Sequence, residues 1–284
     1  MPTFTNKATL SYNGKTTDSN TVTGNYIETL AVTKTAVNQT YADGSTVTYA
    51  VSLINSGITP FSGLTLTDDL GAYPFSVSET LYPLTYADGS LLYYVNGVVQ
   101  AAPTVEATQP LTVSGINVPA GGSALLIYQT TVNEFAPLAQ ASTIENTVTV
   151  TGGGITEPLT ATETVSSSDE PDLSITKALC PSQVVENGAI TYTFVIQNDG
   201  NTPAVATDNA IVTDTFNPIL DITSVTLDGV PLTEGVGYTY DETTGEFATT
   251  AGTITVPAAT YTQQPDGSYE ITPGFATLVV NGTI

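Results

Sequence analysis

The chain has 284 residues, with 27 acidic residues against four Lys or Arg, no His and a net charge of -23. This length suggests about two domains with sizeable cores. The charge argues against nucleic acid or anionic membrane as a partner, because both require clusters of Lys or Arg. Without His there is no Ser-His-Asp triad and no His-containing zinc site. We also find no phosphate loop or dinucleotide fingerprint, so we expect no enzyme, no cofactor and no metal site.

Residues 1–26, the N-terminal hairpin, are predicted to form two strands around the turn dipeptide Asn13-Gly14. This end of the chain has no apolar signal-peptide region, and no run of 18 apolar residues predicts a membrane helix. Export is therefore expected by another route, or after removal of a signal. The single cysteine, Cys180, excludes an intrachain disulfide; an inert thiol is the simplest interpretation, and a link between chains is the alternative.

The remainder of the chain contains two copies of one sequence repeat, and both copies alternate apolar and polar residues as is typical of β-strands. LAVTKTA returns as LSITKAL, TVTYAVSLINSG as AITYTFVIQNDG, and LTLTDDL as AIVTDTF. Unit one spans residues 27–168 and unit two residues 169–284, joined by the polar stretch SSSDEPD. The pattern predicts an all-β protein with two tandem sandwich domains.

Unit one closes with a hairpin, NTVTVTGGGITEPLTATETV, whereas unit two stops at the strand FATLVVNGTI. TNKATLSYNG of the N-terminal hairpin aligns with ENTVTVTGGG of that closing hairpin, and the interval from Asn6 to Lys34 is close to the interval from Asn146 to Lys177. We expect the hairpin of one molecule to complete unit two of the next, as in donor-strand complementation. Its donor strand would bury Phe4, Ala8 and Leu10. Folding back onto its own unit two, or remaining a flexible arm, are the alternatives.

Strand parity directs three polar residues of unit one inward. Lys34, Asp68 and Asn146 each share a strand face with apolar residues, because residues two apart lie on one face. A buried Lys and Asp are costly unless paired or neutralised. Burial lowers the pKa of the Lys and raises that of the Asp, so that the amine can attack the Asn carboxamide while Asp68 shuttles protons. This predicts a Lys34–Asn146 isopeptide bond within the chain.

Unit two repeats the arrangement with Lys177 and Asp214, and Asn6 of the donor strand takes the place of the asparagine. A Lys177–Asn6 bond assisted by Asp214 would join two subunits covalently. Two alternatives stay open for both sites: a buried Lys–Asp salt bridge with the Asn satisfying a hydrogen bond, or a Lys that reaches solvent at the strand end.

The ordered motifs LxVTKTA, TVTYxVxLxNSG, LTLTDxL and NTVTV resemble the bacterial surface repeat family known as domain of unknown function eleven, over nearly the whole chain, twice. The resemblance implies two tandem immunoglobulin-like β-sandwich domains on a cell surface. A two-repeat chain of this size also resembles the appendage proteins of clostridial spores, which can be made in the mother cell without a signal. The Lys, Asn and Asp set is similar to the intramolecular isopeptide sites of Gram-positive pilin and adhesin domains.

These observations predict a structural protein of an extracellular or spore-surface filament, whose partner is a further copy of itself, added head to tail. The alternative is a monomeric surface adhesin that binds a ligand through its loops; such a protein has no need of a displaced hairpin. The sequence identifies neither an anchor protein, an adhesive target nor the helical symmetry.

Overall fold

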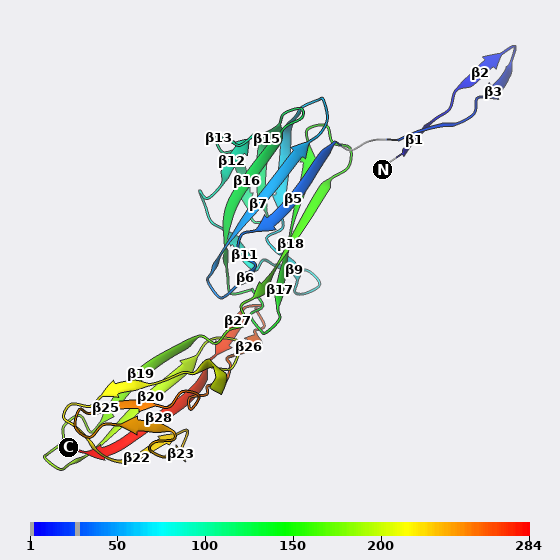
Figure 1. Ribbon diagram of the computed structural model, residues 1–284. Coiled ribbons are helices and arrows are strands. Elements are labelled where there is room, and N and C mark those ends of the chain that lie inside the picture. Colours follow the sequence, from blue (N-terminus) through cyan, green and yellow to red (C-terminus); the bar gives the residue numbers. More distant parts are fainter. Residues whose placement is uncertain (1–2, 26–28) are drawn as a thin grey trace.

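A computed structural model describes residues 3–25 and 29–284. Strands joined by turns make up the described chain, with one short 3-10 helix, η1 (Ala206–Asp208), and no described helix is long and apolar enough to cross a membrane. The prediction of an all-β protein with tandem immunoglobulin-like sandwiches after an N-terminal β-hairpin is confirmed. Figure 1 shows the two sandwiches placed end to end. The exact domain limits at residues 26/27 and 168/169 stay a prediction.

Unit one packs two six-stranded sheets face to face around one core. The first contains β13 (Val98–Gln100), β12 (Leu92–Val95), β16 (Ser123–Val132), β7 (Thr46–Asn55) and β5 (Leu30–Ala36) in that order, with β11 (Leu84–Tyr86) also paired to β16. The second contains β14 (Thr104–Thr108), β15 (Leu111–Val118), β8 (Phe61–Asp68), β17 (Thr143–Gly152), β18 (Leu159–Ser167) and β6 (Thr40–Tyr41). A short pair, β9 (Tyr73–Pro74) and β10 (Thr80–Leu81), lies outside them. Strict alternation along β7 and β16 buries every second side chain, which commits one face of each strand to the core.

Unit two has a second, separate core between a five-stranded and a three-stranded sheet. The larger sheet contains β19 (Leu173–Cys180), β20 (Ala189–Asn198), β28 (Gly274–Thr283), β22 (Asp221–Leu227) and β23 (Val230–Pro231). The smaller one contains β21 (Thr213–Thr215), β25 (Glu246–Thr249) and β24 (Tyr238–Tyr240). Counterparts of β17 and β18 do not occur among the described residues of this unit.

Equivalent hydrogen bonds align the two units residue by residue. Asn55 Nδ2 donates to Thr59 O (2.8 Å) and Pro119 O (3.0 Å), and Asn198 Nδ2 donates at the same two distances to Thr202 O and Pro257 O. Each Asn also accepts from the glycine two residues on, Gly57 or Gly200. Asn55 and Asn198 therefore occupy one position, and so do Lys34 and Lys177 on the neighbouring strands.

A third element of unit two reaches across to unit one. The hairpin of β26 (Thr260–Gln263) and β27 (Tyr269–Thr272), which we name the brace, is inserted where unit one has only the turn Gly121-Gly122. Tyr261 and Ile271 pack against the core of unit one, and the Tyr269 N–H donates to Glu134 O (2.8 Å). At its tip, Gly267 has a φ of +87° and lies against the Leu81 side chain, so only glycine fits there without strain.

The N-terminal hairpin consists of β1 (Thr3–Asn6) paired with β4 (Val22–Asn25) and β2 (Thr9–Tyr12) paired with β3 (Lys15–Asp18). Asn13 and Gly14 both have positive φ, as the predicted two-residue turn requires. The ring of Phe4 lies across Gly24, whose missing Cβ makes room for it. None of the described hairpin residues belongs to either core.

Candidate functional site

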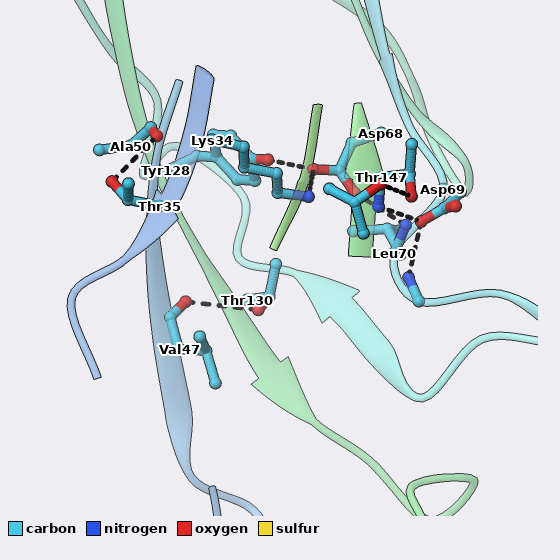
Figure 2. A network of polar contacts seen from close by, with 12 residues as sticks. Lys34, Thr35, Val47, Ala50, Asp68, Asp69, Leu70, Tyr128, Thr130 and Thr147 are labelled. Carbon is cyan, nitrogen blue, oxygen red and sulfur yellow. Dashed lines mark hydrogen bonds and ion pairs between the residues drawn. The ribbon is translucent and has the colours of Figure 1, made fainter. Parts of the chain in front are cut away.

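An ion pair occupies the centre of unit one. Lys34 Nζ donates to Asp68 Oδ2 at 2.8 Å, and both side chains are completely buried. Lys34 comes from β5 in the first sheet and Asp68 from the end of β8 in the second, so the pair bridges the two sheets across the core. Figure 2 shows the two side chains pointing toward one another.

Aromatic residues enclose this pair. The Tyr128 hydroxyl donates to the same Oδ2 of Asp68, and the Leu70 N–H donates to Oδ1 at 2.8 Å. Lys34 Nζ lies 4.5 Å from the centroid of the Tyr49 ring. The carboxylate of Asp68 is thus fixed at both oxygens while the amine lies on an aromatic face.

Asn146 lies on the same inner face as Asp68. Strand β17 pairs with β8 so that Val148 is opposite Asp68, and Asn146, two residues earlier, therefore points to the same side. Asn146 is fully buried, and its amide nitrogen and oxygen make no hydrogen bond to any described residue. The Tyr49 hydroxyl faces this amide without a well-formed hydrogen bond. A buried carboxamide with both atoms unsatisfied is costly and needs a reason.

Burial controls the protonation of this cluster. Desolvation lowers the pKa of Lys34, and the attraction of Asp68 opposes that shift only in part. Burial also raises the pKa of Tyr49 and of Tyr128 well above the usual range. The neutral amine form of Lys34 is therefore more accessible than in a free lysine, and this is the form that can act as a nucleophile.

The equivalent site in unit two is open. Lys177 Nζ donates to Asp214 Oδ2, but the two side chains are 39% and 17% exposed. The amine lies over the rings of Tyr192 (4.5 Å to the centroid) and Phe216 (5.3 Å). Val280 takes the place of Tyr128, because it pairs with Tyr192 as Tyr128 pairs with Tyr49. Asp214 thus has no tyrosine counterpart from that strand.

Two strand edges explain why this site is exposed. In unit one, β8 is flanked by β15 and β17, and Glu163 of β18 accepts from the Ala36 N–H of β5 at 3.1 Å. In unit two, β21 pairs with β25 on one side, and no described strand pairs with its other side. All residues of β19 are exposed, including Leu173, Ile175 and Leu179, whose counterparts in β5 face the core. We name β19 and the free side of β21 the open face.

The N-terminal hairpin carries the remaining predicted residues. Phe4, Asn6, Ala8 and Leu10 are all exposed. Asn6 pairs with Val22 in the hairpin and makes no contact with Lys177 among the described residues, so the chain by itself does not assemble the second Lys, Asn and Asp set. Cys180 is an exposed free thiol at the end of β19. No group of three or more Asp, Glu or Cys side chains in the described ranges is arranged to hold a metal ion.

Tyr49 and Tyr128 were not identified by sequence reasoning. Alternation along SALLIYQTTV indicates that Tyr128 faces inward, but its bond to Asp68 depends on how the two sheets are aligned across the core. No pattern within a single strand contains that information.

Comparisons with known proteins find structural likeness only. No protein-family model matches the chain, and no curated protein sequence matches it. Its structure is similar to that of BcpA, the major pilin subunit of Bacillus cereus, with 14% identity, a TM-score of 0.37 and coverage of 96% of this chain and 73% of that one.

The full-length pilus protein RrgB of Streptococcus pneumoniae is similar at 11% identity and a TM-score of 0.35, covering 91% of this chain but 41% of that one. The collagen-binding domain of a Staphylococcus aureus adhesin is similar at 13% identity and a TM-score of 0.30, covering 50% of this chain and 99% of that one. The chain thus spans less than half of full-length RrgB and 55% of the RrgB backbone structure. We therefore derive function from the residues of this chain.

Proposed function

We propose that the chain is a filament subunit that polymerises head to tail, with the N-terminal hairpin of one copy completing unit two of the next. One observation carries the proposal: unit two has an open face at the place where β17 and β18 close unit one, and the exposed hairpin matches those two strands in sequence. An unpaired strand edge beside exposed apolar residues is a strong site for strand addition.

The register of unit one defines how the hairpin would bind. Val148 lies opposite Asp68, so Ala8, which aligns with Val148, is placed opposite Asp214. Asn6 then takes the position of Asn146 and faces Lys177. Leu10 and Phe4 take the positions of two core residues, Val150 and Ile144. Each inward position of the donor strand thus has a counterpart in unit one.

Chain length argues against a hairpin that folds back onto its own unit two. In the register above, Asn25 takes the place of Ser166, which pairs with Thr40 near the end of the sandwich where unit one meets unit two. The equivalent place in unit two is the far end of the molecule, whereas β5, which begins at Leu30, starts at the opposite end of unit one (Figure 1). The few residues from Asn25 to Leu30 reach at most about 18 Å, and two sandwiches built on ten-residue strands extend about 60 Å. Completion by another copy avoids this conflict.

The buried cluster of unit one supports an isopeptide bond as reinforcement. The neutral amine of Lys34 attacks Cγ of Asn146, a C–N bond forms, the bond from Cγ to Nδ2 breaks and ammonia leaves. Asp68 takes the proton from the attacking nitrogen and delivers one to the departing amide nitrogen. Asn146 has an unsatisfied amide and shares the neighbour Tyr49 with the desolvated Lys34, which supports this chemistry over a simple salt bridge.

In unit two the same chemistry would depend on assembly. Lys177 is solvated until a donor strand covers it, and its Asn partner belongs to another molecule. Insertion of the hairpin would supply Asn6 and exclude water in one event, so that the intersubunit bond forms only at a correctly filled joint. A covalent polymer of this type resists denaturant and protease, which suits a surface or spore appendage. That location rests on the motif resemblance.

Intact mass and gel mobility under boiling, reducing, denaturing conditions test the proposal. Covalent assembly predicts a ladder in multiples of the 29.4 kDa chain. Each isopeptide bond lowers the mass by about 17 Da, the mass of the ammonia that is lost. Asn6→Ala and Lys177→Ala should abolish the ladder, whereas Lys15→Ala, which removes an exposed lysine of the hairpin, should leave it intact.

Three other outcomes are informative. A monomer short by two ammonia molecules would show that the hairpin folds back on its own chain. A monomer whose mass is short by one ammonia molecule would support the bond in unit one and overturn the bond between subunits. Soluble monomers by light scattering at high concentration, without any ladder, would overturn the filament itself and favour the adhesin alternative.

A further inference from the structure

The joint inside the chain offers a template for a joint between chains. At the internal joint, the loop of unit two that follows β20 meets unit one: Asn201 Nδ2 donates to Leu138 O and to Asp169 Oδ1, both at 3.0 Å. Asn201 also lines a cavity of about 520 Å³ together with Tyr41 of β6 and Ala42 of the turn that follows. Unit one thus contributes the end of its sandwich next to β6, and unit two contributes the loop after β20.

Both sides of this joint have an equivalent position in the other unit, where the chain by itself makes no joint. The hydrogen bonds of Asn55 and Asn198 align Gly57 with Gly200, so Ile58 of unit one corresponds to Asn201 of unit two. The turn hydrogen bond from Ser45 N to Ala42 O corresponds to that from Gly188 N to Val185 O, so Val185 corresponds to Ala42. Ile58 follows Asn55, which pairs with Leu30 at the start of β5, and Val185 precedes Asn187, which bonds to the C-terminal Ile284. The start of β5 and the C-terminus lie at opposite ends of the two sandwiches (Figure 1).

Both equivalents are apolar and exposed. Ile58 is 98% exposed and Val185 is 78% exposed, although Asn201 at the internal joint is almost fully buried. Ile58 thus stands where the internal joint has the polar Asn201, and Val185 stands where it has the small Ala42. The two exposed apolar side chains would bury one another if the Ile58 end of one copy met the Val185 end of another.

We propose that Ile58 of one subunit docks against Val185 of the preceding subunit, forming an apolar contact between copies beside the donor-strand joint. The proposal rests on the filament proposed above, because the hairpin brings these two ends together. The linker supports it: Asn25 and Leu30 are five residues apart, and Ser166 and Leu173 at the internal joint are seven apart, so a short linker would also hold the sandwiches close together at the joint between copies.

Site-directed cross-linking tests this contact in the full chain. In a Cys180→Ser background, Ile58→Cys and Val185→Cys are combined, and the assembled protein is treated with a short bis-maleimide. Digestion after Asp and Glu followed by mass spectrometry should identify a peptide that links positions 58 and 185. The matched control combines Ile58→Cys with Val230→Cys, an exposed valine on β23 (64% exposed, against 78% for Val185). A second control adds Leu10→Asp to the first pair, which should weaken insertion of the donor strand.

The contact is supported if the 58–185 peptide forms in the assembled protein, is at least several-fold more abundant than the 58–230 peptide, and is lost with Leu10→Asp. Filaments that form normally but give no excess of the 58–185 peptide would overturn the contact and leave donor-strand assembly standing. If no filament forms with an intact hairpin, the proposed function and this contact both fail.

Discussion

At the residue scale, Asp68 is the group on which the buried cluster depends. It accepts from Lys34, Tyr128 and the Leu70 N–H without any exposure to solvent. We predict that Asp68→Asn prevents the loss of ammonia in unit one, because the carboxyl group that contacts the Lys34 amine is gone, and destabilises unit one by about 3–5 kcal/mol. Intact mass and thermal unfolding, both measured in a Leu10→Asp background that weakens assembly, report the two effects.

Asp88→Asn provides the matched control, since Asp88 lies exposed in a turn of the same unit. It should change neither quantity. An Asp68→Asn chain that still lost ammonia would exclude Asp68 as the proton shuttle.

The buried tyrosines predict a loss of stability in alkali. Burial raises the pKa of Tyr41, Tyr49 and Tyr128 in the folded chain, whereas unfolded tyrosines ionise near pH 10. Above pH 10 the unfolded state therefore binds fewer protons, and the free energy of unfolding falls by up to about 1.4 kcal/mol per pH unit for each such tyrosine.

Lys34 acts in the opposite sense if its bond has not formed. Its folded pKa is lowered, so the unfolded chain binds more protons below pH 10.5 and stability rises toward that value. Denaturant unfolding between pH 8 and 11 measures both slopes. Tyr41→Phe should reduce the alkaline slope, and an unchanged slope in that variant would refute the assignment. A formed isopeptide bond would remove the Lys34 contribution.

At the element scale, the proposed function makes the hairpin a separable ligand for the open face. Neither core includes a described hairpin residue, so the chain without residues 1–25 retains both cores. We predict that a synthetic peptide of residues 1–25 binds this shortened chain and protects the amides of β21 and β19 from hydrogen exchange.

Leu10→Asp in the peptide should weaken binding roughly tenfold or more, because one buried leucine contributes about 1.5–3 kcal/mol. Ser11→Asp, on the other face of the same strand, should have little effect. Equal effects of the two substitutions would mean that the hairpin does not bind in the register of β17.

Parts of this arrangement can be predicted from single strands and parts cannot. Parity alone places Lys34, Asp68 and Asn146 on inner faces, and all three are buried there. The exposure of Lys177 depends on which strands cover it, and the bond of Tyr128 depends on the alignment of two sheets. The brace contains ordinary turn and strand residues, and nothing local indicates that Tyr261 packs against another domain.

At the scale of the whole molecule, net charge opposes assembly. Two chains that each carry -23 repel one another as their ends approach. Salt shortens the Debye length from about 30 Å at 0.01 M to about 8 Å at 0.15 M. We predict that polymer growth, followed by light scattering, is faster at the higher salt concentration.

Sucrose at matched osmolarity controls for solvent effects that do not involve charge. Growth that slows as salt is added would mean that attractive charge pairs, rather than apolar strands, drive the joint.

The brace gives the two kinds of joint different mechanical properties. Within each subunit, β26 and β27 hold unit two against unit one through packing and a backbone hydrogen bond. In the proposed filament, the corresponding place between subunits holds only the short turn Gly121-Gly122, so that joint has no comparable strut. A fibre of such subunits would behave as rigid rods one subunit long, joined by contacts that bend more easily because only the hairpin and the Ile58–Val185 contact hold them. Its curvature in electron micrographs would then occur in steps spaced by one subunit rather than by one domain.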